Sequence, residues 1–357
     1  MLSRVQALRD ELFKCDCDAF VSFFAPANEY LTGFRGSTSA IVITGSEALF
    51  LCDFRYTEQA GQQVRGFAVE EVTGSLEPQA GACLARLGVK RVAVEPSTLS
   101  LAQHLTVQET FGGEVFPVKG IGTAARQIKD AAEREKLRAA TVLAEGALMS
   151  VMPLLQPGIT EAEFAAALEY EFKKCGASGP SFAPIALFGP RSSLPHGVPG
   201  KKPLENGDIV LLDLGCILES YCSDLTRTYA FGTIPGTWFE EIYQVTLTAQ
   251  LAALEAVRPG VTGRDVDAVA RDIITDAGYG KYFGHGLGHG VGLEIHEAPR
   301  LNQHSDTILE PGMAVTVEPG IYIPGKGGVR IEDLVLVTEA GCEILTTLPK
   351  ELKVLGT

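Results

Sequence analysis

Leu155-Gln156-Pro157-Gly158-Ile159-Thr160 and Val257-Arg258-Pro259-Gly260-Val261-Thr262 are matching stretches within one chain, and their repetition indicates the fold class. Each stretch ends one helical segment and begins the next. Their threonines lie 102 residues apart, which predicts two copies of a unit made of helices followed by a sheet. Such a duplication predicts an α+β domain with a pseudo-twofold axis and a cleft between its halves.

The threonine of each stretch begins its helix with the spacing of a capping box. Thr160 precedes Glu163 by three residues, and Thr262 precedes Asp265 by the same interval. The side chains can therefore satisfy free N–H groups of the first turn. Both helices are expected to end at a glycine, Gly176 in the first copy and Gly278 in the second.

Residues 1–125 show a different alternation, of short apolar strands and helical segments, which predicts a separate α/β layer domain. A chain of 357 residues also exceeds the roughly 250 to 300 residues that one hydrophobic core organises. A long helix rich in Ala, Glu, Leu and Arg then runs to about Met152, so we place the domains at 1–125 and 126–357. Strands are expected at 19–24, 40–44, 48–52 and 91–94, and helices at 57–63, 78–87 and 99–108.

The charge balance argues against a nucleic-acid partner. The chain carries 30 Lys and Arg against 44 Asp and Glu, a formal net charge of −14. No basic run is longer than Lys201-Lys202, whereas binding to phosphates needs clustered Lys and Arg. Acidity of this kind promotes solubility, and we expect no nucleic acid among the partners.

The N-terminal segment 1–12 predicts a charged amphipathic helix without the apolar core of a signal peptide. The sequence contains no stretch of about 18 uncharged apolar residues, the length needed to span a bilayer. We therefore expect no membrane partner and a cytoplasmic location. The 8 cysteines, which include Cys15 and Cys17, are accordingly expected to be free thiols.

Two aspartates in the first copy interrupt apolar strands. Two extended segments on either side of a turn near Leu218-Glu219 are expected to pair, which places Asp213 directly opposite Asp224. Opposed like charges destabilise a sheet, and burying an unpaired carboxylate costs free energy. Three arrangements remain open: a metal ion between the two carboxylates, one solvent-facing aspartate, or pairing of both with Arg227.

The second copy contains a glycine-rich segment, Gly284 to Glu297, with three histidines. His285 and His289 are four residues apart, but the alternating glycines disfavour a helix. In an extended chain His285, Leu287 and His289 share one face, and the glycines let another backbone or a ligand approach closely. Catalytic residues concentrate on loops held by a rigid scaffold. The candidate site histidines are His196, in a separate Gly/Pro loop, His285, His289 and His296.

Two glutamates of the second copy match the aspartates of the first. Counted from the threonine that starts each copy, Glu318 and Glu332 lie 56 and 70 residues on, and Asp213 and Asp224 lie 53 and 64 residues on. Four carboxylates and His289 that converge across the pseudo-twofold carry too much negative charge for one divalent ion. We therefore expect two ions, bridged by two carboxylates and holding a water. Oxygen-rich ligands favour Mn²⁺, with Co²⁺ or Zn²⁺ as alternatives.

The segments around these five residues resemble the metal-ligand motifs of the Xaa-Pro aminopeptidase and prolidase branch of the methionine-aminopeptidase-like pita-bread metallopeptidases, peptidase family M24. Tyr30-Leu31-Thr32-Gly33-Phe34 and Asp53-Phe54-Arg55-Tyr56 resemble the creatinase-type N-terminal domain of that branch. The resemblance covers essentially the whole chain. It implies an α/β creatinase-like N-terminal domain, an α+β pseudo-twofold pita-bread catalytic domain, and a homodimer.

The resemblance also implies how the metal ions are held. Asp213 would bind one ion and His289 with Glu318 the other, while Asp224 and Glu332 would bridge the pair. A water held between the ions would attack the scissile carbonyl, with Glu318 as the proton carrier.

Further residues receive expected roles from the same resemblance. His296 would donate a hydrogen bond to the developing oxyanion, and His196 would hold the substrate and its scissile amide. His285 is a candidate either for the wall of the substrate pocket or for a contact that supports a metal-binding side chain. Arg330, two residues before Glu332, is expected to orient a metal-binding carboxylate rather than to bind substrate.

The implied reaction is hydrolysis of Xaa-Pro bonds, in dipeptides as by a prolidase or in longer peptides as by an Xaa-Pro aminopeptidase. Arg300 resembles the position from which prolidases bind the carboxylate of the terminal proline, a contact that suits a guanidinium. It could instead be an exposed surface arginine. We expect the dipeptidase. Creatinases without metal and non-catalytic binding members of the fold lack parts of the ligand set, and the N-terminal domain disfavours a methionine aminopeptidase.

Overall fold

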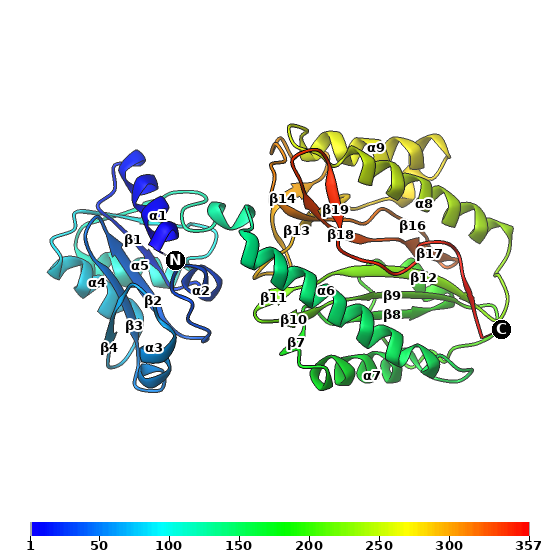
Figure 1. The fold of residues 1–357 in the computed structure, drawn as a ribbon, viewed down its shortest axis with the longest axis horizontal. Coiled ribbons are helices and arrows are strands. Elements are labelled where there is room, and N and C mark those ends of the chain that lie inside the picture. Colours follow the sequence, from blue (N-terminus) through cyan, green and yellow to red (C-terminus); the bar gives the residue numbers. More distant parts are fainter. Residues whose placement is uncertain (1, 357) are drawn as a thin grey trace. The chain divides into compact units, whose positions relative to one another are not determined.

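The computed structural model describes residues 2–356, which form two compact units divided between Arg126 and Gln127 (Figure 1). The division lies beside the boundary expected near residue 125. Met1, the first residue of the expected N-terminal helix, lies outside the described residues.

The first unit is a six-stranded sheet with helices packed on it. The strand order is β4-β3-β2-β1-β5-β6, with β2 antiparallel to β1 and β3 and the other neighbours parallel. Val21, Val42 and Val92 are among the strand residues that form a core with α4 and α5. The elements are α1 (Leu2–Lys14), β1 (Ala19–Ser22), α2 (Ala25–Thr32), β2 (Ala40–Thr44), β3 (Ala48–Cys52), α3 (Thr57–Gln63), β4 (Ala68–Glu71), α4 (Leu76–Arg86), β5 (Arg91–Val94), α5 (Leu101–Phe111) and β6 (Glu114–Pro117).

The hairpin of β2 and β3, helix α3 and strand β5 lie where the sequence predicts them. β1 ends at Ser22 because Phe24 is the N-cap of α2, with Pro26 in the first turn. α5 begins two residues later than expected, at Leu101, since the Ser100 side chain caps it. Helix α2 and strands β4 and β6 were not predicted from the sequence.

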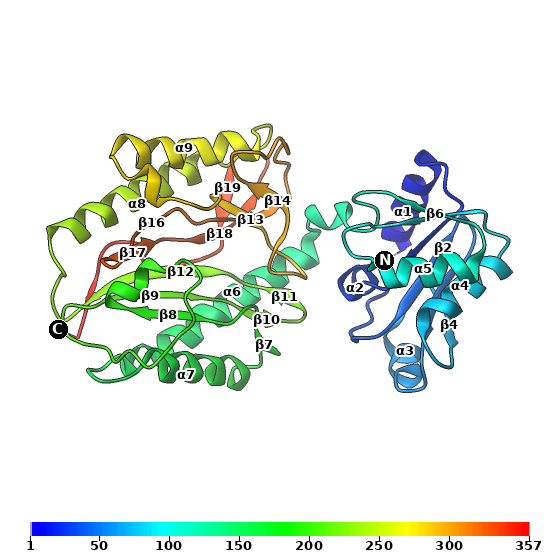
Figure 2. The same cartoon turned by 180° about the vertical axis from the view of Figure 1, so that it is seen from behind.

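The second unit contains two copies of a helix pair followed by strands, as the repeat predicts. α6 packs on α7, and α8 on α9. Figures 1 and 2 show the two helix pairs on opposite sides of the strands. The first copy comprises α6 (Ala131–Val151), α7 (Glu161–Lys174), β7 (Gly179–Pro180), β8 (Ile185–Phe188), β9 (Ile209–Leu214), β10 (Cys216–Leu218), β11 (Tyr221–Cys222) and β12 (Leu225–Phe231).

The second copy supplies a separate five-stranded sheet in the order β14-β13-β15-β18-β19. The last strand of the chain, β20, instead joins the first copy in the order β20-β12-β9-β8. The elements are α8 (Thr237–Ala256), α9 (Gly263–Asp276), β13 (Gly288–Gly290), β14 (Glu297–Leu301), β15 (Ala314–Val317), β16 (Gly320–Ile323), β17 (Gly327–Arg330), β18 (Asp333–Val337), β19 (Cys342–Ile344) and β20 (Val354–Leu355). Short 3₁₀ turns lie at Ala124–Gln127, Met152–Leu154, Gly189–Ser193 and Gly280–Tyr282.

Equivalent backbone contacts support the duplication. The threonine of each copy forms the predicted capping box. Gly158 N–H donates to the Leu204 carbonyl, and Gly260 N–H donates to the Leu309 carbonyl, each at 2.9 Å. The helices end two residues before the expected glycines, Gly176 and Gly278, which have positive φ.

One helical segment within residues 2–356, Ala131–Leu154, is long and apolar enough to cross a membrane by length and composition. Of its most apolar window, 44% is buried inside the structure. Leu137, Ala144 and Leu148 pack into hydrophobic cores. The core helix of a soluble protein passes the same test, so this segment is weak support for a membrane span.

Candidate metal centre

The two aspartates of the first copy share a side of the sheet but are not directly opposite. In the pairing of β9 with β12, Asp213 lies opposite Thr226. The turn of the hairpin occupies Glu219 and Ser220, whose φ angles are 47° and 72°, one residue later than the sequence suggested. The partner of Asp213 therefore moves by two residues, from Asp224 to Thr226. Because side chains alternate between the faces of a strand, an even shift keeps the aspartates on one side.

An arginine accompanies Asp213, but it comes from the second copy. Arg330 on β17 donates through Nη2 to Asp213, the carboxylate-orienting contact expected of it. Arg227, the alternative partner for both aspartates, instead binds Asp333 at 2.8 Å, so that alternative is wrong. The solvent-facing alternative is wrong too, since Asp213 and Asp224 are only 9% and 4% exposed.

Within the glycine-rich segment Gly284 to Glu297, only β13 and the first residue of β14 form strand, and the glycines allow neighbouring backbone to approach closely. A Cβ atom on Gly288 would lie 2.0 Å from the carbonyl oxygen of Thr316. His285 and His289 both line a cavity. Leu287 packs in the hydrophobic core instead, so the expectation that it shares their face is wrong. The segment leaves the extended conformation before β13, which turns Leu287 away from the histidines.

The two glutamates of the second copy flank the end of a strand pair. β15 ends at Val317, opposite Asp333 at the start of β18, so Glu318 and Glu332 are the next residues in register. Glu332 also bridges to Thr226 of the first copy. Its backbone N–H donates to the Thr226 carbonyl at 3.1 Å, and its carboxylate accepts from Thr226 Oγ1 at 2.6 Å. This bridge joins the acids of the two copies.

Side chains from both copies converge on one buried cluster. Ligand atoms of Asp224, His289 and Glu332 lie within 4.8 Å of one another. His289 Nε2 also lies 3.3 Å from Glu318 Oε1. The Asp213 Oδ1 atom is buried without a hydrogen-bond partner among residues 2–356. A buried carboxylate oxygen without a donor is costly unless a cation binds it, so this donor set fits divalent metal ions.

The pKa values of the acids also indicate that this cluster suits a bound cation. Burial, followed by repulsion from Glu332 and Asp213, raises the pKa of Asp224 well above its usual range. Burial and repulsion from Glu318 also raise the pKa of Glu332. Burial raises the pKa of Glu318 as well, but its hydrogen bond with His289 and nearby positive charges outweigh burial and lower the pKa to about 2. A bound cation would stabilise all of these groups as anions.

A cavity of about 610 Å³ adjoins the cluster. Phe182, Ile185 and Ile295 form apolar parts of its wall, so the space beside the acids suits an apolar group of a ligand. Every residue selected from the sequence lines this cavity: Asp213, Asp224, His289, Glu318, Glu332, His196, His285, His296, Arg300 and Arg330.

The exposed members of this set are His196, His296 and Arg300. The rings of His296 and His289 lie edge to face, with centroids 4.4 Å apart. Burial and the charge of His289 lower the pKa of His296. Within the described part of the chain, the side chain of Arg300 forms no hydrogen bond or ion pair. Its guanidinium is thus accessible to a ligand in the cavity.

Tyr322 on β16 is a site residue that the sequence did not single out. Its hydroxyl accepts from Arg330 Nη1 at 2.7 Å and lies 3.0 Å from His285 Nε2. A lone tyrosine in an apolar strand carries no signal of this role. Thr316, which donates to Glu318 at 3.1 Å, was also missed. Its place two residues before Glu318, on the same side of the chain, could have indicated it.

Known proteins resemble this chain over nearly its whole length. The family model for metallopeptidase family M24 matches residues 135–339, and that for the creatinase/prolidase N-terminal domain matches residues 4–128. The Bacillus subtilis (strain 168) protein named Uncharacterized peptidase YqhT is 45% identical over 91% of this chain and 92% of its own. The structure of an Xaa-Pro dipeptidase from Bacillus anthracis has a TM-score of 0.96 and 42% identity, covering 99% of both chains. That of an X-Pro aminopeptidase from Thermotoga maritima MSB8 has a TM-score of 0.88 and 39% identity, covering 95% of this chain and 98% of the other.

Proposed function

The chain belongs to metallopeptidase family M24, and from this premise we propose that it hydrolyses Xaa-Pro peptide bonds with two divalent metal ions. Its fold is a creatinase-type N-terminal domain followed by a pita-bread catalytic domain. We assign residues 1–125 to the first domain and 126–357 to the second.

The observation that carries the proposal is the convergence of five potential ligands from both copies on one cavity. Asp213 would hold one ion, and His289 with Glu318 the other, while Asp224 and Glu332 would bridge them. The unpartnered Asp213 Oδ1 supports this arrangement. Bound ions of this kind supply an activated water and polarise a carbonyl.

Three side chains of the cavity, including the metal ligand Glu318, act in the reaction in this proposal. Glu318, whose side chain in the cavity wall is 17% exposed, would take up a proton from the attacking water and give it to the leaving amine. His296 donates a hydrogen bond to the carbonyl oxygen as negative charge develops there. His196 holds the substrate at its scissile amide. Arg330 and Tyr322 orient Asp213 and His285 through the hydrogen bonds described above.

Within Xaa-Pro hydrolysis we favour the dipeptidase reaction of a prolidase. Arg300 supports this choice, because its accessible guanidinium in the cavity suits the carboxylate of a C-terminal proline. The similarity to the Bacillus anthracis Xaa-Pro dipeptidase supports it as well.

Hydrolysis of longer peptides by an Xaa-Pro aminopeptidase is the second candidate. The similarity to the Thermotoga maritima X-Pro aminopeptidase favours it. A non-catalytic binding role is a remote third candidate. It is disfavoured because all five candidate ligand residues line one cavity.

The finer properties are proposals of the same kind. We propose Mn²⁺ as the bound ion, because oxygen ligands outnumber the single imidazole, with Co²⁺ or Zn²⁺ as alternatives. We propose a cytoplasmic homodimer without nucleic-acid or membrane partners. Light scattering at micromolar concentration should give the mass of two chains, and a monomer mass would contradict the dimer.

Rates on three short peptides test the proposed substrate class. We expect the Mn²⁺-loaded protein to hydrolyse Ala-Pro with the highest kcat/KM, Ala-Pro-Ala more slowly, and Ala-Ala least. A preference for Ala-Pro-Ala would move the assignment to the aminopeptidase. No hydrolysis of either proline peptide would contradict the proposed function.

A further inference from the structure

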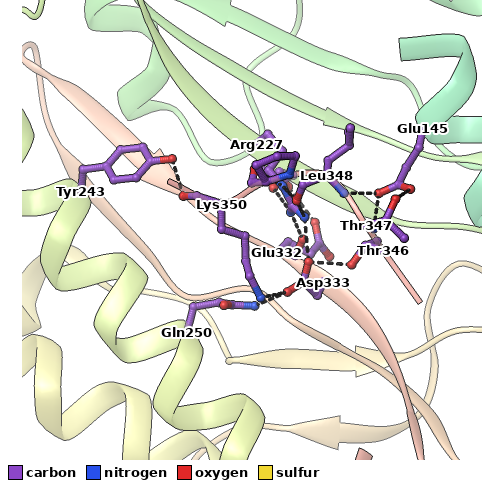
Figure 3. Close-up of polar contacts among 12 residues, drawn as sticks. Glu145, Arg227, Tyr243, Gln250, Glu332, Asp333, Thr346, Thr347, Leu348 and Lys350 are labelled. Atoms are coloured by element: carbon purple, nitrogen blue, oxygen red, sulfur yellow. Dashed lines mark hydrogen bonds and ion pairs between the residues drawn. The ribbon is translucent and has the colours of Figure 1, made fainter. Parts of the chain in front are cut away.

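A second buried polar group lies directly behind the bridging ligand Glu332. The next residue, Asp333, does not line the cavity, because successive side chains of a strand point to opposite faces. Figure 3 shows Asp333 among side chains from distant parts of the chain. We call this group the rear cluster: Arg227 on β12, Gln250 on α8, Asp333 on β18, and Thr346 and Lys350 in the C-terminal segment.

Asp333 is completely buried and accepts four hydrogen bonds. Arg227 Nη2 at 2.8 Å and Thr346 Oγ1 at 2.6 Å bind its Oδ1 atom. Gln250 Nε2 at 2.8 Å and Lys350 Nζ at 2.6 Å bind its Oδ2 atom. Two cations and two neutral donors thus saturate a buried carboxylate, and this geometry fixes the position of Asp333.

Arg227 connects the rear cluster to the backbone of the metal ligand. Its side chain is 1% exposed. Nη1 donates to the carbonyl oxygens of Glu332 and Thr226, whereas Nη2 also donates to the carbonyl oxygen of Leu348 at 2.7 Å. One planar guanidinium therefore holds the peptide at Glu332, the Asp333 side chain and the C-terminal segment in a single arrangement.

The C-terminal segment 346–350 is itself held at both ends. The Glu145 carboxylate on α6 accepts hydrogen bonds from the backbone N–H groups of Thr347 and Leu348. The Tyr243 hydroxyl on α8 donates to the Lys350 carbonyl at 2.8 Å. One segment thereby ties helices of both copies to β18, whose first residue, Asp333, directly follows Glu332 (Figure 3).

We propose that segment 346–350 is a positioning element of the metal centre, acting through Asp333 and Arg227 to hold Glu332 where it can bridge two ions. Thr226 holds the Glu332 carboxylate and N–H from one side, and Arg227 holds its carbonyl. A small rotation of the peptide would move a ligand that both ions share. This inference rests on the proposed function, since it assigns Glu332 as a bridging ligand.

The test is a titration of the metal-free protein with Mn²⁺, carried out on wild type and variants well below their melting temperatures. Lys350→Met removes one cation from Asp333. We expect it to weaken binding of at least one ion by about tenfold or more, as loss of residues that orient metal ligands commonly does. Lys350→Arg, which keeps the charge and a donor, should recover most of the affinity. Thr346→Val removes a single neutral donor and should shift the affinity in the same direction.

Lys202→Met is the matched control. Lys202 also bonds two carboxylates, Glu205 at 2.6 Å and Asp208 at 3.0 Å, and its side chain is 22% exposed against 18% for Lys350. Neither of its partners lines the cavity. The control variant should lose a similar amount of thermal stability and keep the Mn²⁺ affinity of wild type.

Wild-type affinity in Lys350→Met, or an equal loss in Lys202→Met, would overturn the positioning role. If Lys350→Met does not fold, Thr346→Val decides: unchanged affinity in that variant rejects the proposal. A wild-type protein that binds none of Mn²⁺, Co²⁺ and Zn²⁺ would instead reject the proposed function, so the two failures are distinguishable.

Discussion

Asp224 tests the bridging arrangement at the scale of a single side chain. Asp224→Ala should lose at least one metal ion, because a bridging carboxylate holds both ions and its removal leaves the cluster short of negative charge. Metal analysis after dialysis measures the stoichiometry. Asp265→Ala, at the exposed cap of α9, is the control and should keep two ions. Two ions still bound to Asp224→Ala would contradict the bridging role.

Arg300 separates the two peptidase reactions. If its guanidinium binds the carboxylate of a terminal proline, Arg300→Ala should lose a charge-assisted hydrogen bond of about 1.5 to 3 kcal/mol on dipeptides. This corresponds to roughly tenfold to a hundredfold in kcat/KM. A tripeptide places a peptide bond there and should lose much less. The exposed Arg264 lies outside the cavity, so Arg264→Ala should change neither rate.

The outcome for Arg300→Ala has two other readings. Equal losses on dipeptide and tripeptide would mean that Arg300 supports the fold or binds both substrates alike. A preference of the wild-type protein for tripeptides would move the assignment to the aminopeptidase.

The candidate metal ligands could be selected from the sequence because each is unusual in its surroundings. Asp213 stands in an apolar strand and His289 among glycines, settings in which a buried polar side chain needs a partner. Tyr322 could not be selected, since an aromatic residue in a strand is ordinary. Its role depends on Arg330 and His285, which only the folded chain brings to its hydroxyl.

At the scale of elements, Gly288 tests the close packing of β13. Gly288→Ala should destabilise the protein by about 1 to 3 kcal/mol, a typical cost of overpacking, because the added Cβ would meet the Thr316 carbonyl. Gly146→Ala in α6 is the matched control, since nothing lies within 4 Å of its Cβ position. It should stabilise the protein by up to about 1 kcal/mol. Chemical denaturation measures both, and an unaffected Gly288→Ala would contradict the packing argument.

The ends of helices and strands could be predicted where they depend on residues close together in the sequence. They could not be predicted where no residue nearby in the sequence marks them. The capping boxes at Thr160 and Thr262 depend on residues three apart and are present as predicted. The hairpin turn was placed one residue early, because Glu219 and Ser220 adopt positive φ without the glycine or asparagine that usually marks it. Strands β4 and β6 are four-residue edge strands, too short to give a clear alternation.

At the scale of the whole molecule, the duplication explains why the acids converge. Each copy places one acid near the end of a strand and a second directly before the strand that pairs with it, namely Asp213 on β9 with Asp224 before β12, and Glu318 after β15 with Glu332 before β18. The bridge between Thr226 and Glu332 brings the two sets together. The pseudo-twofold was predictable because Pro-Gly and a capping threonine recur in sequence. The rear cluster was not, because its members lie up to 123 residues apart and meet only through tertiary packing.

Removal and re-addition of metal test whether bound ions are required for Xaa-Pro hydrolysis. We predict that exhaustive chelation abolishes hydrolysis of Ala-Pro, because the chain's own side chains cannot activate the attacking water without bound ions. Addition of Mn²⁺ should restore the rate, with full activity at two ions per chain. Full Xaa-Pro hydrolysis by protein shown to be free of metal would contradict the account.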